Sequence, residues 1–246
     1  MPGLRIVCLV AGATVSTVTA QAQQGAEIPL PTIEVIAEQA GGRAGAGVAG
    51  GGAFEQPTAS SERTFTAETL QARPISRPGE ILEAAPGLIV TQHSGEGKAN
   101  QYFLRGFNLD HGTDVAITVD GMPANMRTHG HGQGYADTNF IIPELVGLMQ
   151  VRKGPFFAQE GDFSSAGAVH LTYIDKVDKT LIQKTIGSFG YFRALGITST
   201  KVGQGNLLVA ADANIYNGPW VVPDRVRKFN GVIRYSQGDE SNGFSV

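Results

Sequence analysis

Short stretches of alternating apolar and polar residues recur between residues 88 and 173, and this period of two is typical of half-buried strands. The clearest stretch is Val115–Val119, which stops at the turn dipeptide Asp120-Gly121. A shorter one, Tyr102–Leu104, stops at Arg105-Gly106, where glycine permits a sharp change of direction. Further strands are predicted at residues 88–91, 146–152 and 164–173.

Two short helices are predicted ahead of these strands. The first covers residues 67–72, with Thr66 as its N-cap. The second covers residues 78–85, where Pro78 opens the helix and Pro86-Gly87 ends it. Short helices mixed with short strands and long polar loops indicate a small α+β domain, which we place at residues 57–176.

The last part of the chain alternates over longer stretches, at residues 206–216 and 228–237. These lengths suit tilted membrane-spanning strands with one face toward lipid and the other toward a polar lumen. A soluble β-sandwich alternates in the same way, so the period alone leaves both interpretations open. The apolar face of the first stretch comprises Leu207, Val209, Ala211, Ala213 and Ile215.

The first 22 residues have the pattern of an export signal. Arg5 supplies a positive charge, residues 6–18 are apolar but too few for a membrane span, and Ala20-Gln21-Ala22 matches a small-x-small cleavage site. A buried first helix is the alternative. The single cysteine, Cys8, would leave with the signal, which excludes disulfides, cysteine–zinc sites and thiol catalysis in the mature chain.

Residues 23–56 combine a strand-forming peptide with a flexible linker. Pro29 and Pro31 prevent a helix, whereas Thr32–Ala37 favours an extended strand. Ala40–Ala53 is rich in glycine and alanine and cannot bury enough surface to fold. An exposed strand on such a tether suits pairing with the sheet edge of another protein, and an ordinary first strand or the tag of a periplasmic adhesion module are the alternatives.

Candidate chemistry lies in the polar loop at residues 122–137. The loop places His129 and His131 in an H-x-H spacing and ends at Asp137, and imidazole with carboxylate suits zinc, copper or nickel. Histidines in glycine-rich loops are also commonly solvated or bonded to carbonyls. A secreted metal enzyme would use the same three residues, although no convincing general base accompanies them. With 19 basic and 22 acidic residues in 246, the chain lacks the charge of a nucleic-acid-binding protein. Neighbouring polar loops add His93, Glu96, Lys98, Asp110, His111 and Asp114.

Seven segments follow one another along the chain in this order: TIEVIA, PGEILEAAPGLIV, FLRGFN, ITVDGMP, IPELVGLMQVRKGP, SSAGAVHLTY and GSFGYFR. Together they resemble the N-terminal part of a TonB-dependent outer-membrane receptor. Each is weak alone, but they follow the family's order over nearly the whole chain. One departure is that residues 156–167 read FFAQEGDFSSAG, where the family usually has a tyrosine-glycine pair.

The resemblance implies an α+β plug domain, followed at residues 177–246 by antiparallel strands of an incomplete transmembrane β-barrel. It implies a receptor rather than an enzyme, without a cofactor, in the outer membrane with its plug and N-terminal segment reachable from the periplasm. Such a receptor uses TonB and the inner-membrane partners of TonB to take up an iron–siderophore or another metal complex. Direct import of zinc, copper or nickel through the His-rich loop is the alternative, and a secreted metal-dependent enzyme is a more distant one.

The resemblance also assigns residue roles. Coupling to TonB falls on Thr32, Ile33, Glu34, Val35, Ile36 and Ala37. The plug motif comprises Arg105, Gly106, Asp120, Gly121, Gly154 and Pro155. Substrate contact falls on His129, His131, Gln133, Tyr135, Arg127, His93 and Glu96, with His129, His131 and Asp137 as the candidate metal ligands.

Two further expectations concern the barrel strands. The chain holds four or five of them, where a closed barrel of this class has roughly 22. Because open strand edges leave unpaired backbone groups in lipid, we expect a fragment or truncated gene product whose plug folds while residues 181–246 are disordered or aggregate. Charged residues at the ends of plug strands either hold the plug in the barrel by ion pairs or keep the sheet edge soluble. They are Arg105, Asp120, Glu144 and Arg152.

Overall fold

The structure is a computed structural model that describes residues 60–246 except residue 94 and residues 239–241, and these residues belong to one compact unit. The predicted export signal and the predicted TonB-coupling residues 32–37 lie outside the described residues. Within the described ranges, no helix is long and apolar enough to cross a membrane. We call the described residues up to 176 the plug region.

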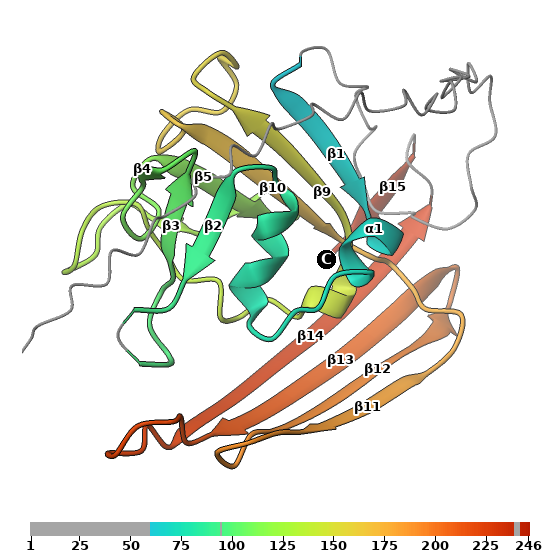
Figure 1. The fold of residues 1–246 in the computed structure, drawn as a ribbon. Coiled ribbons are helices and arrows are strands. Elements are labelled where there is room, and N and C mark those ends of the chain that lie inside the picture. The colour runs from blue at the N-terminus through green and yellow to red at the C-terminus, as the bar shows by residue number, and fades with distance from the viewer. Residues whose placement is uncertain (1–59, 94, 239–241) are drawn as a thin grey trace, which may run out of the picture. The chain divides into compact units, whose positions relative to one another are not determined.

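A five-stranded sheet forms the centre of the plug region (Figure 1). Its strands are β1 (Glu62–Thr66), β9 (Val146–Lys153), β10 (Gly167–Tyr173), β5 (Val115–Val119) and β6 (Met122–Pro123), in that spatial order. β10 and β5 pair in parallel, and the other neighbours pair antiparallel. The sheet therefore joins strands that are far apart in the sequence.

Smaller elements complete the plug region. Its helical parts are α1 (Ala67–Gln71) and two 3-10 helices, η1 (Pro78–Ala84) and η2 (Pro143–Leu145). Three strands, β2 (Leu88–Thr91), β3 (Gln101–Leu104) and β4 (Phe107–Asn108), form a second small sheet. β7 (Asn125–Met126) pairs with β8 (Tyr135–Ala136). The mixture confirms the predicted α+β class.

Two local predictions need correction. The strand expected at residues 164–173 begins only at Gly167, because the residues before it bond to loops instead: Ser164 Oγ donates to the carbonyl of Gly161 at 2.7 Å and the Ser165 hydroxyl binds the Asp114 carboxylate. Thr66 is the N-cap residue of α1, but its side chain makes no capping hydrogen bond and lies 3.4 Å from the Thr69 hydroxyl.

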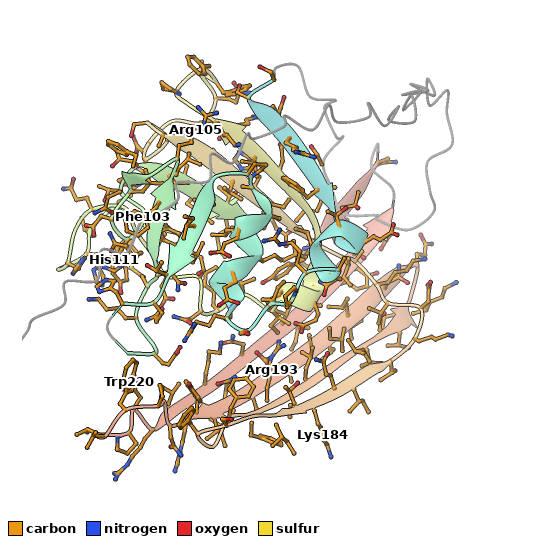
Figure 2. All side chains as sticks on the ribbon, viewed as in Figure 1. Phe103, Arg105, His111, Lys184, Arg193 and Trp220 are labelled. Carbon is orange, nitrogen blue, oxygen red and sulfur yellow. The ribbon has the colours of Figure 1, made fainter. Side chains whose placement is uncertain are left out.

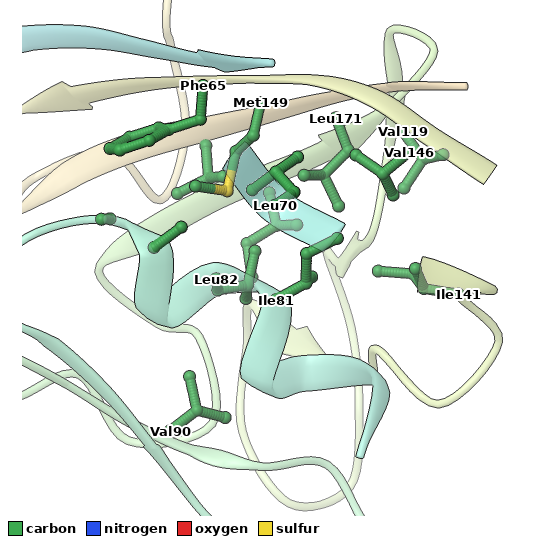
Figure 3. Close-up of a cluster of buried hydrophobic side chains, with 14 of the residues drawn as sticks. Phe65, Leu70, Ile81, Leu82, Val90, Val119, Ile141, Val146, Met149 and Leu171 are labelled. Atoms are coloured by element: carbon green, nitrogen blue, oxygen red, sulfur yellow. The ribbon is translucent and has the colours of Figure 1, made fainter. Parts of the chain in front are cut away.

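The core of the plug region lies between the central sheet and the helices (Figure 3). Leu70, Ile81 and Leu82 come from the helices, and Met149 and Leu171 come from the sheet. None of these five side chains is more than 1% exposed. Burying a side chain of this size contributes roughly 1.5–3 kcal/mol, so this layer is a main source of stability for the plug region.

Five antiparallel strands form a separate sheet in the order β11 (Leu181–Ile186), β12 (Phe192–Val202), β13 (Gly205–Tyr216), β14 (Val226–Gly238) and β15 (Gly243–Ser245). Its outer face is apolar and exposed: Val209 is 38% exposed and Ile233 75% exposed. Lys184 is also exposed and is directed away from the plug region (Figure 2). The alternation predicted at residues 206–216 and 228–237 is confirmed, and none of the predicted outward residues Leu207, Val209, Ala211, Ala213 and Ile215 belongs to the buried core.

The inner face of this sheet packs on the plug region. Leu195 and Leu208 are buried in the same apolar core as the plug side chains, whereas Arg193, Asp212 and Arg234 make ion pairs. Figure 2 shows Arg193 directed from the sheet toward the plug region. The prediction of a polar inner face is therefore correct only in part, because some of this face is covered by apolar plug residues rather than by water.

Candidate functional site

One buried amide joins the loops that carry the candidate ligand residues. Asn125 is 7% exposed, and its Oδ1 accepts the backbone N–H of Ile117 at 2.7 Å. Its Nδ2 donates to the carbonyls of Gly112, Val115 and Gly134 at 2.9, 2.9 and 3.0 Å. Because Gly112 follows β4 and Gly134 precedes β8, this single side chain fixes two loops against β5.

Gly112 allows the same two loops to touch. Its φ is +116°, and a Cβ there would lie 2.7 Å from the Cβ of Ala136 and 2.8 Å from the carbonyl oxygen of Gly134. Next to it, the His111 carbonyl accepts the N–H of Ala136 at 2.7 Å. A side chain at position 112 would push the loops apart, so glycine is needed for the close approach.

Three loops bring imidazoles and a carboxylate together, and we call His93, Asp110, His111 and His131 the histidine cluster. His93 Nε2 lies 3.2 Å from His111 Nε2. Asp110 Oδ1 lies 3.8 Å from His111 Nε2 and 3.9 Å from His131 Nε2. One nitrogen or oxygen atom each from Asp110, His111 and His131 lies within 4.8 Å of the others. Imidazole with carboxylate is a donor set for transition metals.

His111 is held in a defined orientation. Its Nδ1 lies 3.0 Å from the carbonyl oxygens of both Ala99 and Asn100, so we assign the ring proton to Nδ1, which donates to them. Nε2 then keeps its lone pair and faces His93. Burial lowers the pKa of His111 below its ordinary value of 6.5, because the charged form loses its hydration, and the ring is therefore neutral near pH 7.

His129 and Asp137 take other contacts. The His129 ring stacks on Tyr135 with 3.9 Å between ring centroids, and its Nδ1 accepts the backbone N–H of His131 at 3.1 Å. Asp137 Oδ1 accepts the N–H of Asn139 at 2.8 Å. Of the candidate metal ligands His129, His131 and Asp137, the described residues bring only His131 into the histidine cluster. The H-x-H spacing alone does not predict which imidazole joins the histidine cluster, because an irregular loop does not fix the direction of its side chains.

The remaining candidate substrate residues are dispersed. Tyr135 lies beside the histidine cluster, with its ring centroid 5.6 Å from those of His111 and His131. Glu96 is bonded to Arg77 at 2.8 Å. Arg127 and Gln133 are exposed on the surface of their loop. The structure therefore groups His93, His129, His131 and Tyr135, and leaves Glu96, Arg127 and Gln133 apart.

The predicted plug-motif residues form three turns. Arg105-Gly106 and Asp120-Gly121 all have positive φ, between 49° and 79°. Gly154 also has positive φ, and a Cβ there would lie 2.5 Å from the ring of Phe156, which follows Pro155. Asp120 has a second role, because its Oδ1 accepts the N–H of Tyr173 at 3.0 Å. These residues shape the chain where strands end.

Two arginines of the sheet formed by β11 to β15, which we call the outer sheet, bind carboxylates of the plug region. Arg193 donates through both terminal nitrogens to Glu144 at 2.6 and 2.9 Å, and through Nε to Asp212 of β13 at 2.8 Å. Arg234 donates to Asp120 and to Asp175, each at 2.7 Å. These pairs favour the ion-pair interpretation of Asp120 and Glu144 over sheet-edge solubility.

The other two charged residues of that prediction stay within the plug region. Arg152 pairs with Glu62 at 2.8 Å and with Glu160 at 2.7 Å, so it ties β9 to β1 and to a loop of the same region. Arg105 lines a shallow pocket with Phe107.

A cleft of about 770 Å³ lies between the plug region and the inner face of the outer sheet. Charged side chains from both sides line it, and Tyr191 and Tyr216 add aromatic surface. The histidine cluster does not line this cleft. The charged residues are Arg77, Glu96, Glu144, Arg193, Arg227 and Lys228.

Sequence reasoning missed part of this arrangement. Asp110 and His111 were recognised only as residues of a neighbouring polar loop, and Asn125 was not recognised. The Asp-His-Gly run at residues 110–112 is the signal that could have suggested Asp110 and His111 as partners of the H-x-H loop. Asn125 has no local signal, because its partners lie 8 to 13 residues away in other elements.

Part of this chain is similar to a known family and to known receptors. Residues 55–168 match the family described as TonB-dependent Receptor Plug Domain. The Ferrienterobactin receptor of Escherichia coli (strain K12) is 26% identical over 118 residues, which is 44% of this chain and 15% of that protein. The Ferric enterobactin receptor PirA of Pseudomonas aeruginosa is 29% identical over 117 residues, again 44% of this chain and 15% of that protein. The chain thus spans a small part of the length of these relatives.

Solved structures agree with the fold. The structure titled Copper transporter OprC has a TM-score of 0.56 and 19% identity, and the match covers 75% of this chain and 29% of that one. At this identity the likeness concerns the fold alone, which includes both the plug region and antiparallel strands. These matched proteins are named as receptors or as a transporter.

Proposed function

We propose that this chain is part of a TonB-dependent outer-membrane receptor for the energised uptake of a scarce metal complex, and the match of residues 55–168 to the plug-domain family supports this. One observation carries the proposal: the plug region is bound by ion pairs to the inner face of a sheet whose outer face is apolar. Three of the strands are 11 to 13 residues long, which suits tilted strands in an outer membrane.

The loops support an orientation for the plug. Residues 217–225, between β13 and β14, form a longer connection than residues 203–204, between β12 and β13. Longer loops of outer-membrane barrels face the cell exterior and shorter turns face the periplasm. The plug loop at Gly95 lies at the end with the long connection, because a Cβ there would be 3.3 Å from an Asp224 carboxylate oxygen. This arrangement favours plug loops that meet a ligand arriving from outside.

The chain contributes binding and mechanical coupling to the proposed uptake. The ligand binds outward loops, and the strand-forming segment Thr32–Ala37 pairs with the sheet edge of TonB on the periplasmic side. Force on that segment then moves the plug. Ion pairs such as Arg193 with Glu144 suit a contact that is specific yet separable once water enters.

An iron–siderophore or a related metal complex is the proposed cargo. Two relatives are named as receptors for ferric enterobactin, which supports this class. Direct binding of a transition-metal ion is the second candidate, and the histidine cluster is the observation that favours it.

Uptake of labelled cargo by the host bacterium tests the proposal. Cells with the intact gene should accumulate iron-55 supplied as a ferric catecholate siderophore, or zinc-65, in a TonB-dependent manner. Val35→Pro should abolish accumulation and leave surface binding intact, because proline removes a backbone N–H from the pairing strand.

Gln39→Pro is the matched control, since it places the same residue just beyond the proposed TonB-pairing strand. It should accumulate cargo as the unaltered gene does. Equal accumulation by cells with and without the gene, or with and without TonB, would exclude an energised receptor.

A further inference from the structure

Three members of the histidine cluster, Asp110, His111 and His131, present donor atoms to one space, and His93 adjoins them through His111. Asp110 Oδ1 faces His111 Nε2 and His131 Nε2 at 3.8 and 3.9 Å. Distances above 3.5 Å are too long for hydrogen bonds, so the carboxylate faces both rings across a gap. His93 Nε2 lies 3.2 Å from His111 Nε2, within hydrogen-bond distance, and the exposed His93 ring can turn to face the same space.

The buried member of the cluster is prepared to act as a ligand. His111 is 3% exposed, and its Nδ1 donates to two backbone carbonyls. Metal-binding histidines characteristically donate their second ring N–H to a carbonyl or carboxylate, which fixes the ring and directs the other nitrogen at the metal. His111 Nε2 is directed in this way toward the other donors.

Asp110 is held beside His111 by an unusual backbone conformation. Its φ is +50°, which aspartate tolerates better than most residues. Two hydrogen bonds maintain it: the Asp110 N–H donates to Asn108 Oδ1 at 2.8 Å, and the Asp110 carbonyl accepts the N–H of Tyr102 at 3.0 Å. A strained residue with a carboxylate directed at two imidazoles fits a binding role.

The spacing of the donors fits a tetrahedral ion. Zinc bonds to nitrogen of about 2.0–2.1 Å hold neighbouring donors about 3.3 Å apart in a tetrahedral site. His93 and His111 are already at 3.2 Å, and the Asp110 distances need to shorten by about half an ångström. His131 and Asp110 can move, because their side chains are 39% and 52% exposed.

His129 shapes the site without being a donor to it. Its ring is stacked on Tyr135 at an interplanar angle of 11°, and it accepts the N–H of His131. This contact holds the loop so that His131 turns toward His111, with the two rings edge to face and their centroids 4.5 Å apart. A change at His131 therefore removes a proposed ligand, whereas a change at His129 removes only a contact that positions the loop.

We propose that Asp110, His111 and His131 bind one divalent transition-metal ion, zinc in the first place, and that His93 turns to supply the fourth ligand. Three imidazoles and one carboxylate, without a thiolate, suit zinc and also accept copper(II) or nickel. The role of the ion as cargo rests on the proposed function, whereas metal binding itself does not. The site recognises the metal ion directly rather than only an organic chelator around it.

Isothermal titration calorimetry of the untagged 246-residue chain in detergent, with zinc chloride as the titrant, tests the proposal. We expect one zinc ion per chain. His111→Gln and His131→Gln should each raise the dissociation constant at least about 10-fold, since even outer-shell changes cost roughly 10–100-fold. Copper(II) and nickel titrated in the same way rank the metals.

Asp137→Asn and Arg127→Gln are the matched controls, because they alter the loop that carries His131 without removing a donor of the cluster or the contact between His129 and His131. Both should stay within about 3-fold of the unaltered chain, well under the loss that follows an outer-shell change. No heat with zinc, copper(II) or nickel, or equal weakening by Asp137→Asn and His131→Gln, would overturn the site.

His131→Gln keeps the test informative even if a change at buried His111 disturbs folding, because residue 131 is exposed. Circular dichroism of each variant checks the fold, and cobalt(II) absorption should show tetrahedral bands that His131→Gln removes. Zinc binding without TonB-dependent accumulation would support the site and reject the uptake proposal. TonB-dependent uptake of a ferric siderophore by a chain that binds no metal would support the uptake proposal and reject the metal site.

Discussion

Replacing Asn125 by alanine should release the loops that build the histidine cluster while leaving the apolar core in place. The change removes the acceptor of the Ile117 N–H at 2.7 Å. It also removes the donor shared by the carbonyls of Gly112, Val115 and Gly134. No local neighbour in sequence supplies these bonds, so the loops lose their common attachment to β5.

The expected magnitude follows from these bonds. A buried donor left without a partner costs about 1–3 kcal/mol. The two hydrogens of the amide, shared among three carbonyls, amount to about two further bonds at roughly 1 kcal/mol each. We therefore expect Asn125→Ala to lower the free energy of unfolding by about 3–5 kcal/mol, a large share of the roughly 5–15 kcal/mol of a typical domain.

Urea unfolding of the 246-residue chain, followed by circular dichroism, measures this loss. A zinc titration of the same sample, below the unfolding transition, measures its effect on the site. Gln133→Ala is the control, because Gln133 is exposed on the loop that precedes Gly134. An Asn125→Ala chain whose free energy of unfolding lies within about 0.5 kcal/mol of the unaltered chain would refute the reasoning, since that is the range of an ordinary surface change.

Two other changes test the packing around the site and the sheet. Arg193→Met leaves the carboxylates of Glu144 and Asp212 without their cation, and we expect a loss of about 3–5 kcal/mol in the same urea experiment. An unchanged urea midpoint would show that these ion pairs do not hold the sheet to the plug region. Gly112→Ala should cost about 1–3 kcal/mol through its contacts under 3 Å, whereas Gly132→Ala, with open space around it, should cost little. Thermal unfolding of the two variants compares them, and equal midpoints would contradict the close approach.

Local pattern was sufficient for strands and turns. Val115–Val119 and Leu88–Thr91 were predicted with the bounds that the structure has. Asp120-Gly121 ends its strand at positive φ, as a turn dipeptide should. These strands and turns depend on residues that are close in sequence, so the residue types and their alternation are enough to predict them.

The start of β10 shows where local pattern fails. The sequence places residues 164–166 in the same strand as the residues that follow them. In the structure, the Ala166 N–H donates to the carbonyl of Asp114, which is not part of a strand. The helix at Pro78–Ala84 similarly takes the 3-10 form, a distinction that its apolar spacing does not resolve. The start of β10 therefore depends on a partner that is distant along the chain.

The sequence by itself determined the class of the fold and the outward apolar face of β13 and β14. It also carried the resemblance to TonB-dependent receptors, which the plug-domain match confirms. Only the tertiary structure decided which polar residues meet. His93, His111 and His131 come from three loops, and their convergence depends on the Asn125 amide and on the close approach at Gly112. Side-chain alternation is a property of each strand alone, whereas the geometry of a binding site depends on how separate loops are held against one another.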